Sequence, residues 1–323
     1  MTDTQRATAR SRARAGGAAA AVAGALLLSG CGGTGGSGGA AGASGHHRAA
    51  ASAPTAAPTT APTTAPTAAT TAPAGGCTTA APASGAGPAV TPVDLNAWQL
   101  ILPVAKPGDP KAAEQLTPAR PTDPYLTQGP GGSLTFWAPA GGATTAHSLH
   151  SRTELAALGT FTPGTACHHL TESLSVGQLP EVSHEITIGQ IHGTDADEAA
   201  PFVMLAVQGD SVGVTLETVP KSEGSVGPAP AGEKILKYHL LSGVRLGTPF
   251  GYTVTDNGNG TLTFTGDCAG TPGCQAGSPV TIPVPPAWSG HLVRFMAGDY
   301  EQDDAATSHT GGGRLTVFGV GVS

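Results

Sequence analysis

The chain of 323 residues contains 48 glycines and 28 prolines, only 4% aromatic residues, and a formal net charge of −7. Residues 88–323 alone carry 10 lysines and arginines against 21 aspartates and glutamates, a formal balance of −11. This acidic balance excludes general nucleic-acid binding, which requires a basic surface.

The N-terminal segment, residues 1–31, has the organisation of a bacterial export signal. Arginines come first, an apolar run follows from about Ala18 to Leu28, and small residues precede Cys31. The run is too short to span a bilayer comfortably, and its end resembles a lipobox, in which the cysteine is lipidated and becomes the mature N-terminus. We therefore expect an extracellular lipoprotein that contacts the membrane only through a lipid on Cys31. The alternative is an ordinary signal peptide with an incidental cysteine.

Residues 32–87 are expected to form a disordered linker. They consist largely of Gly, Ser, Ala, Thr and Pro, and Ala-Pro-Thr units repeat between Ala53 and Pro73. Such a segment has no large apolar side chains to offset the entropy cost of ordering. Its prolines favour an extended, semi-rigid spacer.

Residues 88–323 are long enough for one domain with a sizeable core. Short alternating segments separated by Gly and Pro indicate many β-strands. Gly251–Thr255 and Thr261–Thr265 flank Asp256–Gly260, whose residues tolerate positive φ, so a hairpin is predicted there. Asp109–Leu116 can form a short helix. We predict an all-β jelly roll, a sandwich of two antiparallel sheets, with a substrate groove on the concave face.

Besides Cys31, the chain has four cysteines, which suits an exported protein and allows three pairings. Cys268 and Cys274 enclose a turn-rich loop and are expected to pair with each other. Cys77 and Cys167 would then pair and pin the start of the domain to its body. The spacings lack the paired knuckles of a zinc site, so we expect neither a metal nor a cofactor.

Polar residues gather in three clusters on strand-like segments, namely Ser151–Leu155, Gln190–His192 and Phe295–Gln302. Because side chains alternate along a strand, Arg152 and Glu154 share one face of theirs, and Gln190 and His192 share one face of theirs. In the late strand that carries the third cluster, one phase comprises Arg294, Met296, Gly298, Tyr300 and Gln302. These faces are expected to line an open groove that suits a polymer.

One detail breaks this alternation. Ile186 and Ile188 fall in the same phase as the polar Gln190. Either another element covers this part of the strand, or a bulge near Gly189 shifts its register.

The residue types in these clusters suit one kind of chemistry. A uronate in a polysaccharide carries a carboxylate next to its carbon 5 proton. Removing that proton requires a group that neutralises the carboxylate, a base, and an acid for the leaving oxygen. Arginine and an amide can serve the first need, and histidine and tyrosine the other two. We therefore expect an anionic polysaccharide as partner.

The clusters resemble polysaccharide lyase family 7, the alginate lyases, which are β-jelly rolls. The family motifs R-[ST]-E-L-R, Q-[IV]-H and Y-F-K-A-G-x-Y-x-Q read here as Arg152–Ala156, Gln190–His192 and Arg294–Gln302. Trp98–Pro103 looks like the first strand of the family, so the resemblance covers about residues 90–323. It implies cleavage of alginate by β-elimination, which leaves unsaturated uronate ends.

The resemblance also implies roles for residues. The predicted catalytic set is Arg152, Gln190, His192 and Tyr300. The predicted substrate-binding set, to which we add the neighbouring His150, is Glu154, Arg294, Gln302 and His150. Arg152 and Gln190 would neutralise the carboxylate, His192 would assist there or act as the base, and Tyr300 would protonate the leaving oxygen. In the family, tyrosine is thought to be both base and acid on mannuronate, with histidine as the base on guluronate.

Two departures from the family pattern concern charge. Ala156 stands where the family often has a second arginine, and Met296 stands where it has a lysine. Arg294, at a tyrosine position, restores part of the lost positive charge. Fewer cations favour weaker polyanion binding, a shorter substrate, or another uronan such as glucuronan.

A different class of protein, a non-catalytic carbohydrate-binding jelly roll, is the further alternative. An aligned acid and base argue against it, because binding alone requires neither. Hydrolysis would need two carboxylates flanking the groove, and Glu154 is the only acidic residue of a motif on the expected groove face. We expect the protein to be a monomer.

Overall fold

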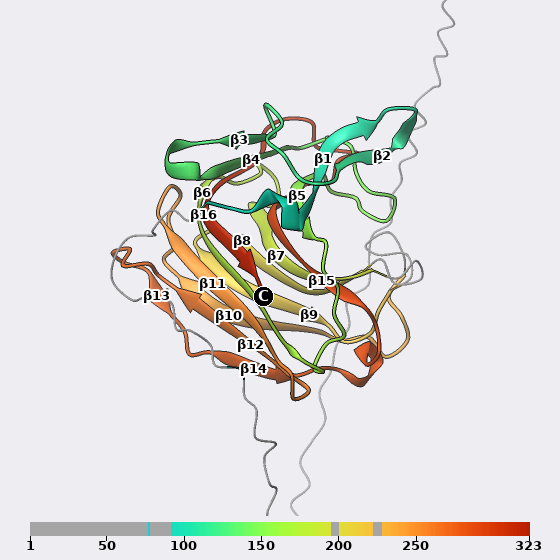
Figure 1. The fold of residues 1–323 in the computed structure, drawn as a ribbon. Helices are drawn as coiled ribbons and strands as arrows, with labels where there is room; N and C mark the ends of the chain where they lie inside the picture. Colours follow the sequence, from blue (N-terminus) through green and yellow to red (C-terminus); the bar gives the residue numbers. More distant parts are fainter. Residues whose placement is uncertain (1–76, 78–91, 195–199, 222–227) are drawn as a thin grey trace, which may run out of the picture. The chain divides into compact units, whose positions relative to one another are not determined.

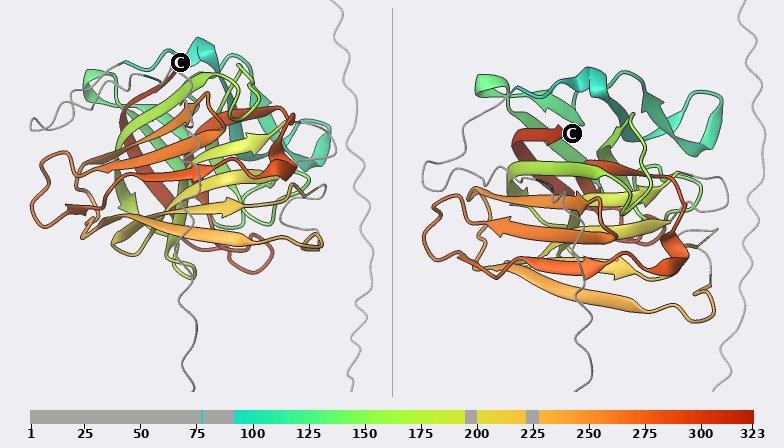
Figure 2. Two further views of the ribbon diagram at one scale, coloured as in Figure 1. Left: turned by 90° about the horizontal axis from the view of Figure 1, so that it is seen from below. Right: turned by 60° about the horizontal axis from the view of Figure 1, so that its bottom comes forward.

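The computed structural model describes Cys77 and residues 92–194, 200–221 and 228–323. Within these residues the chain forms two antiparallel β-sheets that pack face to face (Figure 1). Figure 2 shows the two layers of strands from two further directions. The predicted all-β sandwich is confirmed, whereas the predictions for Cys31 and for most of the linker lie outside the described residues.

One layer is a nine-stranded sheet. Its strands are β1 (Trp98–Lys106), β2 (Asp109–Leu116), β5 (Arg152–Ala157), β7 (Glu185–Gly193), β8 (Pro201–Gln208), β9 (Ser211–Glu217), β10 (Ile235–Ser242), β13 (Gln275–Ala276) and β15 (Val293–Glu301). They lie in the order β13-β10-β9-β8-β7-β15-β5-β1-β2. All three predicted polar clusters therefore fall on neighbouring strands, β7, β15 and β5.

The other layer is a seven-stranded sheet. Its strands are β3 (Leu126–Gln128), β4 (Leu134–Pro139), β6 (Cys167–Gln178), β11 (Phe250–Asn257), β12 (Thr261–Asp267), β14 (Val280–Pro283) and β16 (Gly312–Val322). They lie in the order β14-β12-β11-β6-β16-β4-β3. Short 3-10 helices occur at η1 (Leu95–Ala97), η2 (Pro130–Gly132) and η4 (Pro286–Trp288).

The hydrophobic core lies between the sheets. Leu155 and Ile191 enter it from the nine-stranded sheet, and Phe136 and Phe264 enter it from the seven-stranded sheet, all fully buried. Since side chains alternate along a strand, the neighbours of Leu155 and Ile191 emerge on the face of the nine-stranded sheet that is turned away from the core. This alternation places the polar clusters on that outer face.

The expected short helix at Asp109–Leu116 is wrong, because this segment is strand β2. It pairs antiparallel with β1, with Leu100 opposite Leu116 and Ile101 opposite Gln115. Pairing outweighs the helix propensity of its Ala, Glu and Gln residues, as tertiary context commonly does. Pro110 is tolerated because β2 is the edge strand of the sheet.

The bulge offered as one explanation for the phase of Ile186 and Ile188 is present. The register between β7 and β8 shifts between Thr187 and Gly189. Both isoleucines consequently stay in the core, while Gln190 turns to the outer face. Glycine is required at the bulge because a Cβ on Gly189 would collide with the hydroxyl of Tyr252.

Both expected disulfides are present. Cys77 bonds to Cys167 at the start of β6, and Cys268 bonds to Cys274, with Cα–Cα distances of 5.8 and 5.6 Å. The predicted hairpin is also confirmed, because β11 and β12 pair around the turn after Asp256.

Candidate active site

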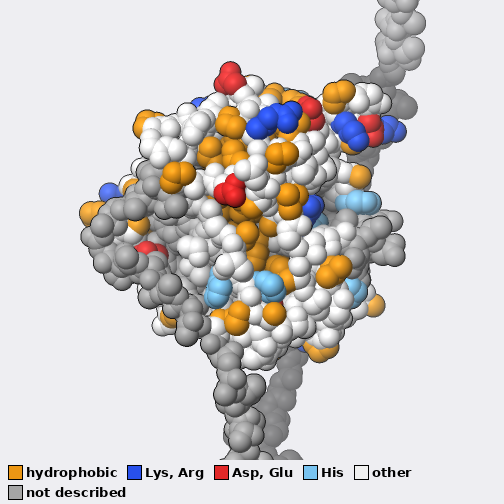
Figure 3. All heavy atoms as spheres, in the orientation of Figure 1, with side chains coloured by type: hydrophobic (Ala, Val, Ile, Leu, Met, Phe, Trp, Pro, Cys, Tyr) orange, Lys and Arg blue, Asp and Glu red, His pale blue; other side chains and the backbone are white. Residues whose placement is uncertain are grey.

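A cavity of about 410 Å³ opens on the outer face of the nine-stranded sheet. Its lining includes Ser148, Arg152, His192, Arg294, Met296 and Tyr300. On the face in Figure 3 the basic side chains form a few separate groups, some of them beside acidic ones, and no continuous basic surface. The chain as a whole is acidic, with a formal net charge of −7, so the cations of the cavity stand against an acidic background.

Strand order explains why these side chains meet. β15 lies between β5 and β7, and the register places Tyr300 opposite Arg152 and Arg294 opposite His192. Cross-strand neighbours on one face lie close enough for their side chains to interact. Three segments distant in sequence thus supply one site.

Arg152 and Tyr300 are in direct contact. Arg152 is 4% exposed, and its guanidinium carbon lies 3.7 Å from the centre of the Tyr300 ring, a cation–π geometry. The Tyr300 Oη atom lies 2.9 Å from Ser148 Oγ, and Arg152 Nη2 donates to the same Ser148 oxygen at 3.2 Å. Ser148 therefore connects the cation with the phenol.

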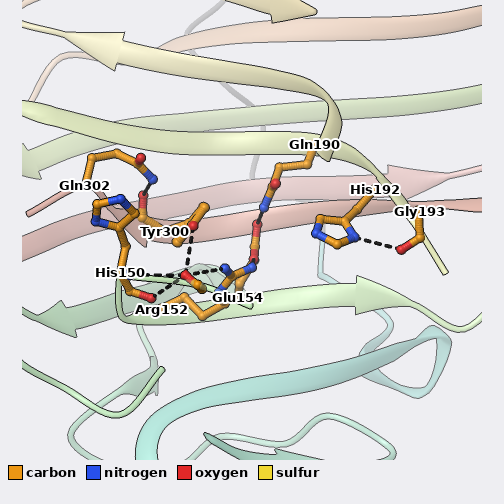
Figure 4. A network of polar contacts seen from close by, with 9 residues as sticks. His150, Arg152, Glu154, Gln190, His192, Gly193, Tyr300 and Gln302 are labelled. Atoms are coloured by element: carbon orange, nitrogen blue, oxygen red, sulfur yellow. Dashed lines mark hydrogen bonds and ion pairs between the residues drawn. The ribbon is translucent and has the colours of Figure 1, made fainter. Parts of the chain in front are cut away.

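Glu154 and Gln190 lie behind Arg152 and are fully buried. Glu154 Oε2 accepts from Arg152 Nη1 at 3.0 Å, and its other oxygen accepts from Gln190 Nε2 (Figure 4). Burial raises the pKa of Glu154, and the neighbouring Arg152 opposes that shift. Neither side chain lines the cavity. In this structure the Glu154 carboxylate holds Arg152 and Gln190, and the roles of Glu154 in binding substrate and of Gln190 in neutralising its carboxylate stay predictions.

The surroundings of His192 favour a neutral imidazole with its hydrogen on Nδ1. Its Nδ1 atom lies 2.8 Å from the carbonyl oxygen of Gly193, which can only accept, so Nδ1 carries the hydrogen and Nε2 keeps a lone pair. Burial lowers the pKa of His192 to about 4; the Gly193 carbonyl opposes this, while Arg152 and Arg294 add to it. At neutral pH the ring is therefore able to accept a proton.

The remaining predicted residues divide into two groups. Arg294 lines the cavity and is half-buried, with no partner for its Nε atom among the described residues. Gln302 and His150 stand beside Tyr300 but do not line the cavity: Gln302 Nε2 donates to the Tyr300 carbonyl at 3.1 Å, and the His150 and Tyr300 rings are 5.9 Å apart. Both are placed to support Tyr300.

Two features of the site were not predicted from the sequence. Ser148 lies in a loop ahead of the first motif, where no periodicity or motif distinguishes it. Met296 packs with Ile101, Ala113 and Ala156 in a small apolar cluster separate from the main core. The cavity consequently has one cationic wall and one apolar wall.

Within residues 92–194, 200–221 and 228–323, together with Cys77, no three His, Cys, Asp or Glu side chains are grouped as a metal site requires. In the same part of the chain, no helix has the length and apolar character needed to cross a membrane.

A cation, a neutral imidazole and a phenol around one cavity of a β-sandwich suit the abstraction and donation of protons on an anionic sugar. Fold and site together define a polysaccharide lyase. Residues 93–323 match the family model described as "Alginate lyase", and the chain belongs to this family. It is an alginate-cleaving lyase.

Solved structures agree with this assignment. The alginate lyase of Pseudomonas aeruginosa is 26% identical, with a TM-score of 0.57 over 71% of this chain and 99% of that one. Alginate lyase A1-II', of polysaccharide lyase family 7, is 23% identical, with a TM-score of 0.57 over 72% of this chain and 96% of its own. The alginate lyase of Klebsiella pneumoniae is 19% identical, with a TM-score of 0.56 over 71% and 95%. Variants of A1-II' have been solved with a GGG product and a GGMG substrate. No curated protein matches the chain.

Proposed function

We propose that the cavity carries out β-elimination on the uronate units of alginate, with Arg152, His192 and Tyr300 as its catalytic groups. The observation that carries this proposal is the convergence of these three side chains, from three neighbouring strands, on one cavity. The family match and the related structures make another uronan, or a non-catalytic binding module, the less favoured alternatives.

Arg152 and Arg294 are assigned to the substrate carboxylate. Each has a buried Nε donor without a partner among the described residues, and buried donors of this kind are normally satisfied. A carboxylate can accept from guanidinium donors in charge-assisted bonds and thereby becomes less negative, which makes the adjacent proton more acidic. Gln190 contributes indirectly: its amide donates to the Glu154 carboxylate, which accepts from Arg152 and positions it.

The proton transfers are then assigned as follows. His192 Nε2 takes the carbon 5 proton, and the electron pair of that bond forms the double bond between carbons 4 and 5. The bond from carbon 4 to the glycosidic oxygen breaks, and the Tyr300 hydroxyl gives its proton to that oxygen. This assignment applies to guluronate; on mannuronate Tyr300 takes both roles.

The direct test is ultraviolet absorbance of the conjugated unsaturated uronate. The purified chain is incubated separately with polymannuronate, polyguluronate and glucuronan. We expect absorbance to rise on at least one alginate polymer, to stay flat in Tyr300→Phe, and to be kept in Tyr125→Phe, a matched tyrosine outside the cavity. A flat trace from the folded wild-type protein on all three polymers would contradict the proposal.

We also propose that the enzyme works outside the cell as a monomer anchored through a lipid on Cys31. The basic-then-apolar order that ends at this cysteine supports the anchor, and the two disulfides are compatible with extracellular action. When cells are grown with labelled fatty acid, the label should be incorporated into the wild-type protein and not into the Cys31→Ser variant. Equal labelling of both would refute the anchor.

A further inference from the structure

We propose that Ser148 is a positioning residue for Tyr300, and that its hydroxyl changes partner as Tyr300 loses and regains its proton. This inference rests on the proposed function, because it concerns the proton that Tyr300 gives to the leaving oxygen. Ser148 is 7% exposed and lines the cavity, so its hydroxyl is held in place by protein atoms.

Several hydrogen-bonding groups surround Ser148 Oγ. The His150 carbonyl oxygen lies 3.0 Å away and the His150 amide nitrogen 3.1 Å away. Arg152 Nη2 lies 3.2 Å away and Tyr300 Oη 2.9 Å away. Four groups therefore lie within hydrogen-bond distance of one hydroxyl oxygen.

A serine hydroxyl can satisfy only three partners, because it has one hydrogen to donate and two lone pairs. The His150 amide and the Arg152 guanidinium can only donate to it, and the His150 carbonyl can only accept from it. Tyr300 Oη is the single partner that can do either. The four contacts cannot all be made at once. Which hydrogen bonds Ser148 makes depends on whether Tyr300 is a neutral phenol or a phenolate.

Two hydrogen-bond arrangements around Ser148 are possible without movement of any heavy atom. With a neutral Tyr300, the Ser148 hydrogen points to the His150 carbonyl, and the Tyr300 hydroxyl can donate to Ser148 Oγ in place of one N–H donor. After Tyr300 has given its proton to the leaving oxygen, the phenolate can only accept. The Ser148 hydrogen then turns to Tyr300 Oη, and both N–H donors bond to the serine lone pairs.

The second arrangement stabilises the product of proton transfer. A charge-assisted bond from Ser148 reaches the phenolate oxygen, while the Arg152 cation lies 3.7 Å from the centre of the same ring. The proton balance is closed when solvent returns a proton to the phenolate and removes the proton held by His192. Because the Ser148 oxygen is already in place, only its hydrogen has to turn when the charge forms.

The experiment compares Ser148→Ala, Ser148→Thr and the wild-type full chain on the alginate polymer that the wild type cleaves. Ser148→Ala should lower kcat by about 100-fold, the usual cost of removing one positioned donor to a developing oxyanion. KM should stay unchanged, because the lost interaction forms only as the charge develops. Ser148→Thr keeps a hydroxyl and should restore most of kcat. The solvent deuterium isotope effect on kcat should rise in Ser148→Ala, because proton donation becomes slower.

A matched control is Ser133→Ala, a buried serine outside the cavity whose hydroxyl bonds to the Pro130 carbonyl. It should behave like the wild type. A Ser148→Ala enzyme as fast as wild type, or one with only a raised KM, would overturn the inference while leaving β-elimination intact. Equal loss in Ser148→Ala and Ser148→Thr would show that loop shape matters and not the hydroxyl, which also overturns it. An inactive wild-type enzyme would contradict the proposed function itself.

Discussion

His192 shows how local contacts determine the state of one side chain. The Gly193 carbonyl fixes the hydrogen on Nδ1, and burial together with two arginines disfavours a second proton. The ring is therefore neutral over a wider range of pH than a free histidine, whose pKa is about 6.5. A neutral ring with a free lone pair is what a general base requires.

The pH dependence of the enzyme should reflect this state. Since the pKa of His192 is lowered to about 4, kcat/KM should fall only as the pH drops through about 4, where the base becomes protonated. Arg294→Met removes a positive charge that lowers this pKa, so the acidic limb should move to higher pH. The measurement is kcat/KM against pH on a short alginate oligomer.

The control for this prediction is Arg314→Met. Arg314 belongs to β16 of the other sheet, where it stacks on Trp137, and its loss should leave the acidic limb in place. An acidic limb in the wild type that Arg294→Met leaves unmoved would show that His192 is not the group that titrates.

At this scale the sequence predicts which residues form the site better than it predicts what each one does. Arg152, His192 and Tyr300 are recognisable because motifs mark them, and all three line the cavity. The burial of Glu154 could not be read from alternation, since the outer face of β5 is itself covered. Ser148 could not be found because its importance comes from four neighbours that only the folded chain brings together.

Strand β15 carries both the groove residues and part of the core. Met296 and Tyr300 line the cavity, whereas Phe295 and Ala297 belong to the core. The register of β15 against β7 shifts between Ala297 and Tyr300, and Gly298 within this interval has a φ of +132°. Residues with a side chain rarely adopt such a conformation.

Gly298→Ala should therefore damage both stability and catalysis. A Cβ at this position would lie 2.9 Å from the Thr153 carbonyl oxygen and 3.1 Å from Glu154 Cα. Backbone strain of this kind costs about 1–3 kcal/mol, and relief would move Tyr300 relative to Arg152. Thermal unfolding and kcat measure the two effects.

Gly321→Ala provides the matched control, because a Cβ at Gly321 in β16 would meet no atom within 4 Å. It should leave both quantities near their wild-type values. A Gly298→Ala protein with unchanged thermal stability and kcat would show that β15 tolerates the added carbon.

Strand features were predicted correctly where the local residue pattern in the sequence indicated them. The clash of phases around Ile188 indicated either a covering element or a bulge, and the Asp256–Gly260 turn predicted a hairpin. The irregularity at Gly298 left no such signal, because the side chains of β15 keep their alternation opposite β5. Strand β2 was missed because its composition favours a helix and only its pairing with β1 makes it a strand.

For the molecule as a whole, an acidic residue inside the sandwich affects stability. Glu172 of β6 is 1% exposed and lies opposite Tyr252 of β11, whose hydroxyl donates to the Ile188 carbonyl at 3.1 Å. Burial raises the pKa of Glu172 to about 8, Tyr252 opposes this, and Glu154 raises it further. The carboxyl group is therefore mostly protonated at neutral pH.

This pKa predicts the direction in which stability changes with pH. The folded-state value of about 8 exceeds the unfolded value of about 4.3, so between them the folded state holds the extra proton. The contribution of Glu172 to stability is therefore lost as pH rises through this window, by up to about 1.4 kcal/mol per pH unit, and is constant above it. Glu172→Gln should remove this slope and be the more stable protein at about pH 8.

Urea unfolding at several pH values between about 5 and 9 tests this directly. Glu114→Gln on the edge strand β2 is the control and should follow the wild-type curve. A Glu172→Gln protein less stable than the wild type at the alkaline end would contradict the prediction.

The fold class and the cysteine pairs could be predicted because composition, strand length and a short turn-rich loop each limit the alternatives. The order of strands within the sheets could not, because it depends on pairings between segments far apart in the sequence, such as β15 between β5 and β7. Alternation along β6 places Glu172 in the same phase as the core residues Leu170 and Leu174, but no motif singled it out in the sequence, and carboxylates are seldom buried.

The Cys77–Cys167 disulfide has a mechanical consequence. A force applied to the chain ahead of Cys77 passes through the covalent bridge directly into β6, at Cys167. β6 lies between β11 and β16 in the seven-stranded sheet, so the load enters the layer opposite the cavity. The covalent path from Cys77 into the domain therefore does not run along the backbone of β5 or of the Ser148 loop.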